Sequence, residues 1–562
     1  MKTAYFNGCI YTGQLPTAEA FLEENGYFTK VGSNEEIAAT EADRKVDLQG
    51  RFVCAGFNDS HMHLLNLGQA LSVAPLHLYT GSLQEMILCL QQMQPGQGGW
   101  IIGRGWNQDF FADVNRMPNR WDLDQVSTEY PVCAIRACGH AMVVNSKALK
   151  ILGITAQTPQ IPGGEIVMEK GVPTGILFDN AMDLVYAAVP APTKEELKAM
   201  LRTACKMLNS YGITSCQSDD YCVFQNIPWQ VINDAYRELE DAGELTVRVY
   251  EQANFTNPSD LAAFVEAGNM TGVGTDSFKI GPLKMLGDGA LGARTAYLTK
   301  PYRDDPTTKG LSVFTPEVFD QMIGYANEKN MQVAVHCIGD ACLDLVLSSI
   351  EKALTAHPKA DHRHGIVHCQ ITRPDQLERM AKLNLHVYAQ SIFLDYDLHI
   401  VEDRVGKELA ASSYSWKTLM DKGITVSNGS DCPVEMPNVM GGIQCAVTRR
   451  DLMGDGPYLP HEAFTVQEAL DSFTKVGAKA SFEEAIKGTI APGMLADFVV
   501  LGENPFEVEP RKLKDIPIGD IASCVSYSSQ LPTVLGKGST SRMLPMPVRY
   551  MTQRSKPRPK PA

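Results

Sequence analysis

Eight short apolar stretches recur through the chain, and each ends in polar residues. They cover residues 52–63, 212–220, 248–255, 278–289, 332–340, 364–370, 386–393 and 425–431. Between them lie segments with a helical spacing of apolar residues, such as 194–212, 318–330, 340–354 and 373–384. Strands that alternate with helices indicate parallel βα units, and a closed barrel is the economical arrangement for eight of them. The pattern therefore predicts an α/β protein with a (β/α)8 TIM-like barrel over residues 53–487.

One connection is far too long for a single crossover helix. It runs from about 65 to 193 and contains further strand-like runs at 100–106, 131–146 and 161–175. Connections of this length usually carry structure of their own. We interpret 65–193 as an inserted subdomain over the mouth of the barrel that helps to form the substrate pocket.

The two ends of the chain have a similar character. Residues 1–52 and 488–545 hold short β-like runs, among them CIYTG, YFTKVG, ADFVVLG and IASCVSYSS. We predict that both ends together form a small β-sandwich. The last residues, 546–562, are basic and rich in proline, which is typical of a flexible tail.

Composition and charge narrow the class of protein. Hydrophobic residues make up 44% of the chain and charged residues 20%, as in an ordinary globular protein. The formal net charge of −15 disfavours nucleic acid and anionic membrane surfaces as partners. No segment approaches the roughly 20 apolar residues of a membrane span, and the 14 cysteines form no CxxC pair. We expect a cytoplasmic protein with a small-molecule substrate and no nucleic-acid or membrane partner, and a homodimer is left open.

Polar residues with metal-binding chemistry stand at the ends of the predicted strands. The carboxyl ends of barrel strands converge on one face, so residues distant in the sequence become neighbours there. His61 and His63 are two positions apart on one strand, so both rings point to the same side and can reach one ion. An HxH pair alone is weak evidence, but further candidates end other strands. The full set is His61, His63, Lys284, His336, His368 and Asp431.

A series of motifs in order along nearly the whole chain resembles the amidohydrolase superfamily, and specifically its YtcJ-like "amidohydrolase 3" group. The motifs are AGFNDSHMH (55–63), GHAMVVNSKAL (139–149), LKMLGDGALGARTA (283–296), VHCIGDAC (335–342), HGIVHCQ (364–370), NGSDCPVEMPN (428–438) and GTIAPGMLADFVVL (488–501). The resemblance implies a metal-dependent hydrolase with one or two divalent ions, usually zinc, in such a barrel. Ala55 and Val367 depart from the family pattern, which commonly has proline and glutamate there.

The resemblance also implies a role for each candidate ligand. His61, His63 and Asp431 match the ligands of one ion, and His336 with His368 match those of a second. Lys284 matches a position that can be a carboxylated lysine bridging two ions, because an unmodified ammonium cannot ligate a cation. The alternative for Lys284 is a charged lysine paired with Asp288 or another carboxylate. Lys279 is a competing lysine, but five residues away on a strand it would face the opposite side.

Asp431 has a second predicted role as the catalytic residue that accepts a proton from metal-bound water and passes it to the leaving group. The alternative is a strand-end aspartate that caps the next helix. Further candidates for substrate binding are Trp106, His140, Asn145 and Arg294. For each of these a structural role is at least as well supported by the sequence.

These observations predict hydrolysis of a carbon–nitrogen bond other than a peptide bond, of the amide, N-formyl or cyclic-amide type. An ester or phosphoester hydrolase on the same metal site is the first alternative, because fold and ligands do not determine the electrophile. An alternative of another class is a non-catalytic barrel that binds a ligand. A deaminase is disfavoured, because VHCIGDAC lacks the glutamate typical of that group.

Overall fold

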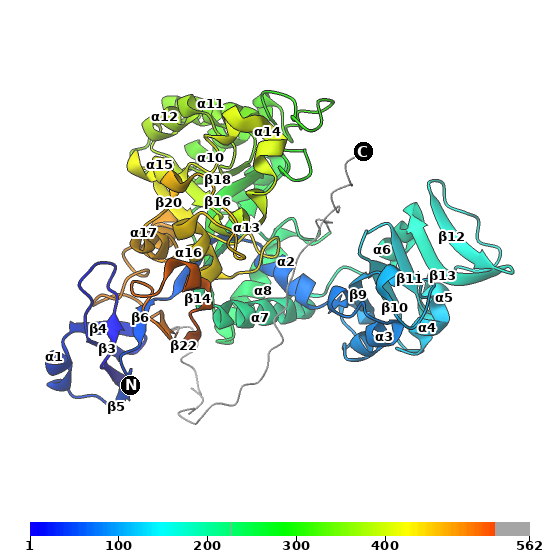
Figure 1. Cartoon of the computed structure of the whole chain (residues 1–562), viewed down its shortest axis with the longest axis horizontal. Helices are drawn as coiled ribbons and strands as arrows, with labels where there is room; N and C mark the ends of the chain where they lie inside the picture. The colour runs from blue at the N-terminus through cyan, green and yellow to red at the C-terminus, as the bar shows by residue number, and fades with distance from the viewer. Residues whose placement is uncertain (225, 523–562) are drawn as a thin grey trace, which may run out of the picture. The chain divides into compact units, whose positions relative to one another are not determined.

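The computed structural model describes residues 1–224 and 226–522, and its centre is an eight-stranded parallel sheet that curves into a nearly closed barrel (Figure 1). Neighbouring strands in the sheet follow their order in the chain. They are β7 (Phe57–Met62), β14 (Ile213–Ser218), β15 (Arg248–Asn254), β16 (Phe278–Leu286), β17 (Val333–Cys337), β18 (Gly365–His368), β19 (His386–Ala389) and β20 (Thr425–Asn428). The predicted fold class and all eight predicted barrel strands are thus confirmed.

Backbone hydrogen bonds connect the first barrel strand to the segment that follows the last. The amide of Asp431 donates to the carbonyl of His61 at 2.8 Å, and the amide of His63 donates to the carbonyl of Cys432 at the same distance. These bonds lie at the carboxyl end of the sheet. The contact that closes the barrel therefore also brings together three of the predicted ligands.

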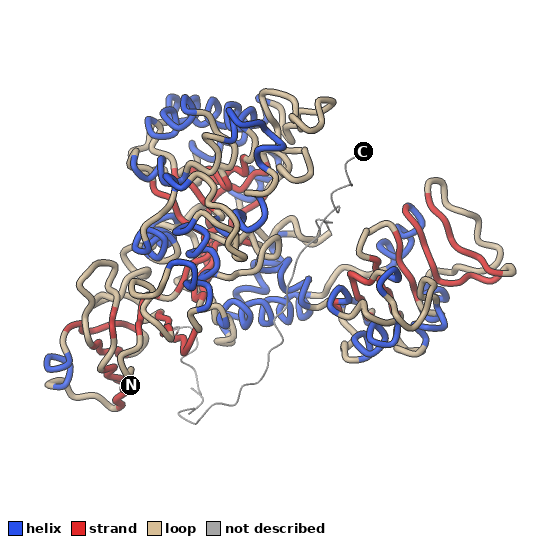
Figure 2. The backbone as a smooth tube through the Cα atoms, viewed as in Figure 1, coloured by secondary structure: helices blue, strands red, loops and turns tan. Residues whose placement is uncertain are grey.

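Amphipathic helices cover the outside of the barrel, as predicted from their spacing of apolar residues. Figure 2 shows the strands in red enclosed by helices in blue. Four of these helices match the predicted segments: α7 (Lys194–Ser210), α10 (Pro316–Glu328), α11 (Asp340–Ala356) and α12 (Pro374–Lys382). The others between and after the strands are α8 (Trp229–Asp241), α9 (Pro258–Glu266), α13 (Leu394–Asp397), α14 (Val401–Ala410), α15 (Trp416–Asp421), α16 (Val439–Thr448), α17 (Val466–Ser472) and α18 (Lys475–Ala480).

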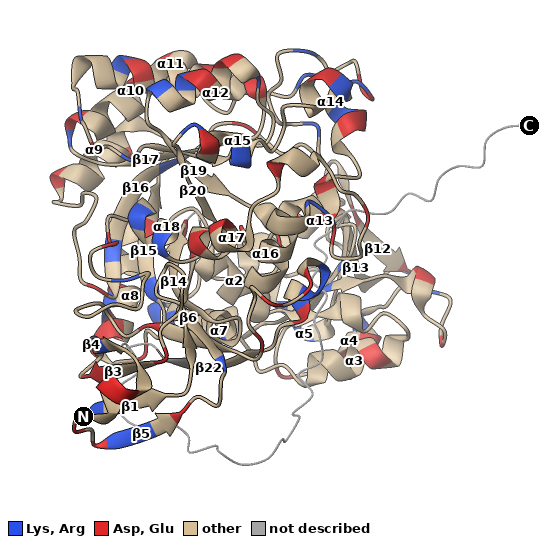
Figure 3. Cartoon of the chain, turned by 60° about the vertical axis from the view of Figure 1, so that its left-hand side comes forward, with Lys and Arg blue, Asp and Glu red and all other residues tan. Residues whose placement is uncertain are grey.

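The outer helices carry charges of both signs, visible in blue and red in Figure 3. On α12, Arg379 lies 3.3 Å from Glu351 of α11. Arg373, which precedes α12, lies 2.9 Å from both Asp340 and Asp344. Such surface pairs each contribute little to stability, so the apolar contact between helices and sheet is the main source of packing energy.

The first predicted strand, 52–63, proves to be two strands. β6 (Phe52–Ala55) and β7 are separated by Gly56, where an added Cβ would lie 2.2 Å from the hydroxyl oxygen of Thr214. β6 pairs with β21 (Phe498–Leu501) outside the barrel. The close approach at Gly56 lets the chain pass from one sheet to the other without a loop.

A small β-sandwich is built from both ends of the chain. One sheet has the order β4-β3-β1-β5 and the other β2-β6-β21-β22. Their core contains Tyr5, Phe21 and Phe498, whose rings lie 4.6–5.3 Å apart. The remaining elements are β1 (Lys2–Phe6), β2 (Cys9–Ile10), β3 (Ala20–Glu24), β4 (Tyr27–Gly32), α1 (Asn34–Ala38), β5 (Arg44–Asp47) and β22 (Ile518–Ala522). The predicted tail at 546–562, and the predicted sandwich residues after 522, lie outside the described residues.

The chain divides into two compact units, of which the second contains, among the described residues, 65–204, 224 and 226–235. Its mixed sheet has the order β12-β13-β11-β10-β9-β8. Successive residues of β10, Val132 and Cys133, belong to different apolar clusters, so both faces of the sheet are covered. The long connection therefore carries its own core, while its predicted place over the barrel mouth stays a prediction. Its elements are β8 (Ala74–Pro75), α3 (Leu83–Gln91), β9 (Ile101–Trp106), α4 (Arg120–Asp124), β10 (Val132–Arg136), β11 (Ala141–Val144), α5 (Ser146–Ile151), β12 (Gly164–Glu169), β13 (Val172–Asp179) and α6 (Asp183–Ala188), with α2 (Leu64–Leu71) leading into it.

Among the described residues, no helix combines the length and apolar character that crossing a membrane would require.

Candidate metal centre

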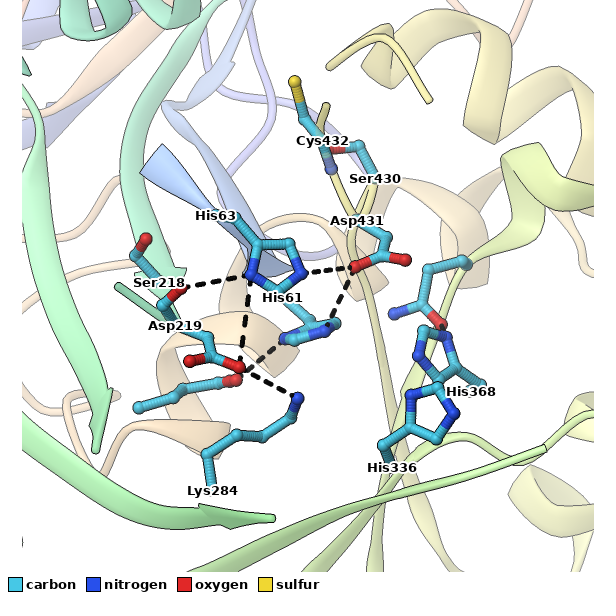
Figure 4. A network of polar contacts seen from close by, with 12 residues as sticks. His61, His63, Ser218, Asp219, Lys284, His336, His368, Ser430, Asp431 and Cys432 are labelled. Carbon is cyan, nitrogen blue, oxygen red and sulfur yellow. Dashed lines mark hydrogen bonds and ion pairs between the residues drawn. The ribbon is translucent and has the colours of Figure 1, made fainter. Parts of the chain in front are cut away.

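Polar side chains from every barrel strand meet at the carboxyl end of the sheet (Figure 4). Four of the predicted residues lie within a strand, His63 directly follows β7, and Asp431 follows the last strand. Three further residues that sequence reasoning did not select join them from the remaining strands. In strand order the set is His61 and His63, Asp219, Gln252, Lys284, His336, His368, Gln390 and Asp431.

His61, His63 and Asp431 converge on one point, and we refer to them as the first ligand group. The Nε2 atoms of His61 and His63 lie 3.2 Å and 3.0 Å from the same oxygen, Oδ1 of Asp431. One ligand atom from each residue lies within 4.8 Å of the others. His61 and Asp431 are buried, and the side chain of His63 is 21% exposed. The group is thus compact and open to solvent on one side.

The partners of the other ring nitrogens decide which nitrogen carries the proton. Nδ1 of His61 lies 2.8 Å from Oε1 of Gln252, and Nδ1 of His63 lies 3.1 Å from the carbonyl oxygen of Asp219. Both partners are acceptors, so in the neutral ring each Nδ1 carries the hydrogen and each Nε2 presents a lone pair. Two lone pairs and a carboxylate oxygen directed at one point fit a divalent cation.

The two histidines of the first ligand group differ in basicity. Burial, aided by the positive charge of Lys284, lowers the pKa of His61 to about 4. Burial also acts to lower the pKa of His63, but the hydrogen bond and charge of Asp431 outweigh it and raise that pKa to about 9. Despite its burial, Asp431 has a pKa well below its usual range because both histidines bond to it. Asp431 is therefore an anion at neutral pH, as ligation requires.

Lys284 is fully buried on β16 and lies beside the first ligand group. Its Nζ is 3.1 Å from Oδ2 of Asp219. Asp219 follows β14, and its Oδ2 also accepts a hydrogen bond from Asn254 at 3.0 Å. The partner of Lys284 is thus Asp219 and not Asp288, which instead accepts the backbone amides of Ile338 and Gly339. The sequence signal that could have identified Asp219 is the pair of aspartates at the end of the predicted strand 212–220.

The competing lysine is directed elsewhere. Lys279 lies at the start of β16, and its Nζ is 2.9 Å from Glu483. The two lysines therefore occupy different environments, and only Lys284 lies with the proposed ligands.

His336 and His368 lie next to each other, with ring centroids 4.5 Å apart, and the ring of His368 is 5.6 Å from that of His61. Nδ1 of His368 lies 2.7 Å from Oε1 of Gln390, which leaves Nε2 as the lone-pair nitrogen. Nε2 of His336 lies 3.1 Å from the carbonyl oxygen of Gly289, so in the neutral ring Nδ1 is the nitrogen with the free lone pair. Both rings can act as ligands, but their nitrogens are not part of the compact first group.

The backbone is unusual at two of these positions. His368 and Asp431 have positive φ values, 70° and 59°, although neither is glycine. Such conformations cost free energy and persist only where the surroundings impose them. At Asp431 the surroundings include Asp59, a fully buried carboxyl whose oxygens accept the backbone amide and the hydroxyl of Ser430 at 2.5–3.2 Å. Burial raises the pKa of Asp59 to about 7.

The alternative role of Asp431 as a helix cap is not what the structure shows. The next helix, α16, is capped by the side chain of Asn438, which accepts the amide of Gly441 at 3.0 Å. The side chain of Asp431 bonds to the two histidines instead.

The four residues predicted to bind substrate have other partners. Trp106 and Asn145 are fully buried in the second unit, where Trp106 donates to the carbonyl of Ala134 and Asn145 caps α5. His140 is exposed and lies 3.0 Å from Asp179. Arg294 forms a two-pronged ion pair with Asp304. These contacts explain the residues structurally, and their substrate roles stay predictions.

Fold and site together define a metal-dependent hydrolase. A model of the amidohydrolase family matches residues 44–527, and the chain belongs to this family. It is 34% identical to a Bacillus subtilis (strain 168) protein named "Putative amidohydrolase YtcJ", over 91% of this chain and 96% of that one.

Two further comparisons agree with this class. The crystal structure of an uncharacterized metal-dependent hydrolase from Pyrococcus furiosus is 29% identical and superimposes with a TM-score of 0.73, covering 90% of this chain and all of that one. The N-substituted formamide deformylase of Arthrobacter pascens is 25% identical over 89% of this chain and 93% of its own.

Proposed function

We propose that the protein hydrolyses a carbon–nitrogen bond other than a peptide bond, in a small amide, N-formyl or cyclic-amide substrate. The observation that carries the proposal is the convergence of Nε2 of His61 and Nε2 of His63 on one oxygen of Asp431, in a chain related over most of its length to an N-substituted formamide deformylase. Neutral imidazole nitrogens and a carboxylate can bind a divalent cation and still leave it able to act as a Lewis acid.

Each residue of the first ligand group has a part in this reaction. His61, His63 and Asp431 would hold one divalent ion, which polarises a carbonyl and lowers the pKa of water when bound. Both histidine contacts of Asp431 use Oδ1. We assign to its Oδ2 the role of taking a proton from the attacking water and delivering it to the leaving nitrogen. Amide hydrolysis needs this delivery, because an unprotonated amine anion is a poor leaving group.

Zinc is the proposed metal, because mixed imidazole and carboxylate ligands suit it. For a second ion, Nδ1 of His336 and Nε2 of His368 are the nitrogens available as ligands. A carboxylated Lys284 would supply oxygens to both ions. The position of Lys284 supports this: it is fully buried at the centre of the set, with Asp219 as its charged neighbour. Incubation with ¹³C-bicarbonate should give a carbamate signal in the wild-type NMR spectrum that Lys284→Met lacks.

The decisive experiment compares the bond types that the zinc-loaded protein hydrolyses. Formamides and esters with the same acyl group are assayed beside phosphotriesters, and N-substituted formamides or related amides should have the highest kcat/KM. If esters or phosphotriesters are turned over and all amides are not, the proposed bond type is wrong. Purified protein with fewer than about 0.2 metal ions per chain after loading would instead favour a non-catalytic binding protein.

A further inference from the structure

A short pattern, tyrosine and then glutamine two residues later, occurs on two strands that lie half-way round the barrel from each other. It is Tyr250 and Gln252 on β15, the third strand, and Tyr388 on β19, the seventh, with Gln390 just after it. We infer that Gln252 and Gln390 are positioning residues for the metal. Each holds one histidine, His61 or His368, in the tautomer and orientation that metal binding needs. The inference rests on the metal site of the proposed function.

The two tyrosines connect these strands deeper in the barrel. The hydroxyl of Tyr250 donates to Oε1 of Gln332 at 3.3 Å, and Nε2 of the same Gln332 donates to the hydroxyl of Tyr388 at 3.1 Å. All three side chains are buried. One amide therefore links two strands across the barrel interior, and this link limits how far either strand can shift along its axis.

Both the oxygen and the nitrogen of the Gln252 side-chain amide have hydrogen-bond partners. Oε1 lies 2.8 Å from Nδ1 of His61, and Nε2 donates to the carbonyl oxygen of Ser60 at 3.2 Å. A flipped amide would set its oxygen against that carbonyl oxygen, so the orientation is determined by Ser60. His61 must then carry its hydrogen on Nδ1, and Nε2 is left for the ion.

Gln390 does the same for His368 from the other side. Its Oε1 lies 2.7 Å from Nδ1 of His368, and the residue has no exposed surface. Its Nε2 has no partner among the described residues although it is buried. A buried donor without a partner costs free energy, so the bond to His368 is kept at the expense of stability. This is the pattern expected when function and not folding selects a residue.

An amide also differs from the carboxylate that often supports a metal-bound histidine. It accepts the Nδ1 hydrogen without adding a charge. Asp219 and Asp431 already lie buried in the set, and further buried anions would raise its electrostatic cost. Two neutral partners therefore orient the histidines without adding to the negative charge that Asp219 and Asp431 already bring to the site.

Metal retention tests the inference without relying on turnover. Zinc affinity of the full-length protein is measured by competition with a chromophoric chelator, and the visible spectrum of the cobalt-loaded protein reports ligand geometry. Gln252→Leu and Gln390→Leu should each weaken zinc binding about 10–100-fold and change the cobalt bands. Gln390→Glu keeps an acceptor for Nδ1 and should restore binding to within a few-fold of wild type.

Gln217→Leu is the matched control. Gln217 is a fully buried glutamine on β14 whose Nε2 donates to the carbonyl of Gly477 at 3.0 Å, away from the histidines. It should keep the zinc affinity and cobalt spectrum of wild type.

Three outcomes would overturn the inference. Zinc affinity unchanged in both Gln252→Leu and Gln390→Leu shows that neither residue supports the metal, and an equal loss in Gln217→Leu shows only a general effect on the barrel. A wild-type protein that binds no zinc overturns the inference together with the proposed site. Zinc binding without amide turnover would count against the proposed reaction alone, since the affinity comparison still decides the role of the glutamines.

Discussion

The two sets of histidines at the barrel rim differ in what their lone-pair nitrogens face. In the first ligand group, His61 and His63 share one anion, Oδ1 of Asp431, at 3.2 Å and 3.0 Å. His336 and His368 share no such anion among the described residues: Nε2 of His336 lies 3.1 Å from the carbonyl oxygen of Gly289 and 3.4 Å from Oδ1 of Asp288. Barrel closure brings the first group together, because backbone bonds link His61 and His63 to the segment that carries Asp431.

This difference indicates which of the two candidate sites the unmodified polypeptide can form. The first group needs only side chains and the closing hydrogen bonds, so it can be organised before any ion binds. The second set needs an added bridging anion, and Lys284 can provide one only after carboxylation. We therefore expect the first site to bind metal more tightly than the second.

The largest effect should come from Asp431→Ala, which removes the anion shared by both histidines and the proposed proton carrier. We expect kcat to fall at least about 10³-fold and the tightly bound ion to be lost, as measured by steady-state kinetics and elemental analysis. Asp320→Ala is the control, because it breaks an ion pair with Lys352 at 2.6 Å on the outer helices, away from any candidate metal ligand. Retention of the ion by Asp431→Ala would place the tight site elsewhere.

A smaller effect is expected from Lys284→Met, which should remove the weaker ion and spare the tighter one. Metal content should fall by one ion per chain, with a loss of about 10–100-fold in kcat. Lys279→Met, on the same strand but paired with Glu483, should keep both ions and full activity. Equal loss of both ions from Lys284→Met would contradict the independence of the two sites.

Asp59→Ala tests whether barrel closure organises the first group. The change leaves the amide and hydroxyl of Ser430 without their buried partner and should lower the free energy of unfolding by about 1–3 kcal/mol. Urea denaturation gives this value, and metal titration should show weaker binding at the tight site only. Undiminished affinity there would mean that the closing segment is held without Asp59.

The smallest effect is expected from Arg294→Ala. Its guanidinium is occupied by Asp304, so removing it should change kcat/KM by less than about threefold on neutral amides. A loss above about tenfold would show instead that Arg294 leaves Asp304 to bind substrate, as the sequence had suggested.

The sequence was a good guide wherever a signal is local. Apolar runs that end in polar residues predicted the eight strands, and the histidines at their ends indicated the candidate ligands. It failed where a role depends on a distant partner: nothing local in 52–63 shows that Gly56 must pass close to Thr214. Gln252 and Gln390 were overlooked because a single glutamine in a strand is unremarkable until the histidine it faces is known.

By itself the sequence determined the order of strands and helices, the residue types at the strand ends and the family, because periodicity and short motifs are properties of neighbouring residues. Only the tertiary structure decided that Lys284 faces Asp219 and not Asp288, that Arg294 is held by Asp304, and that the two histidines share one oxygen of Asp431. These are choices among several chemically suitable partners. Closing the barrel makes them, because it sets which side chains lie within hydrogen-bonding distance.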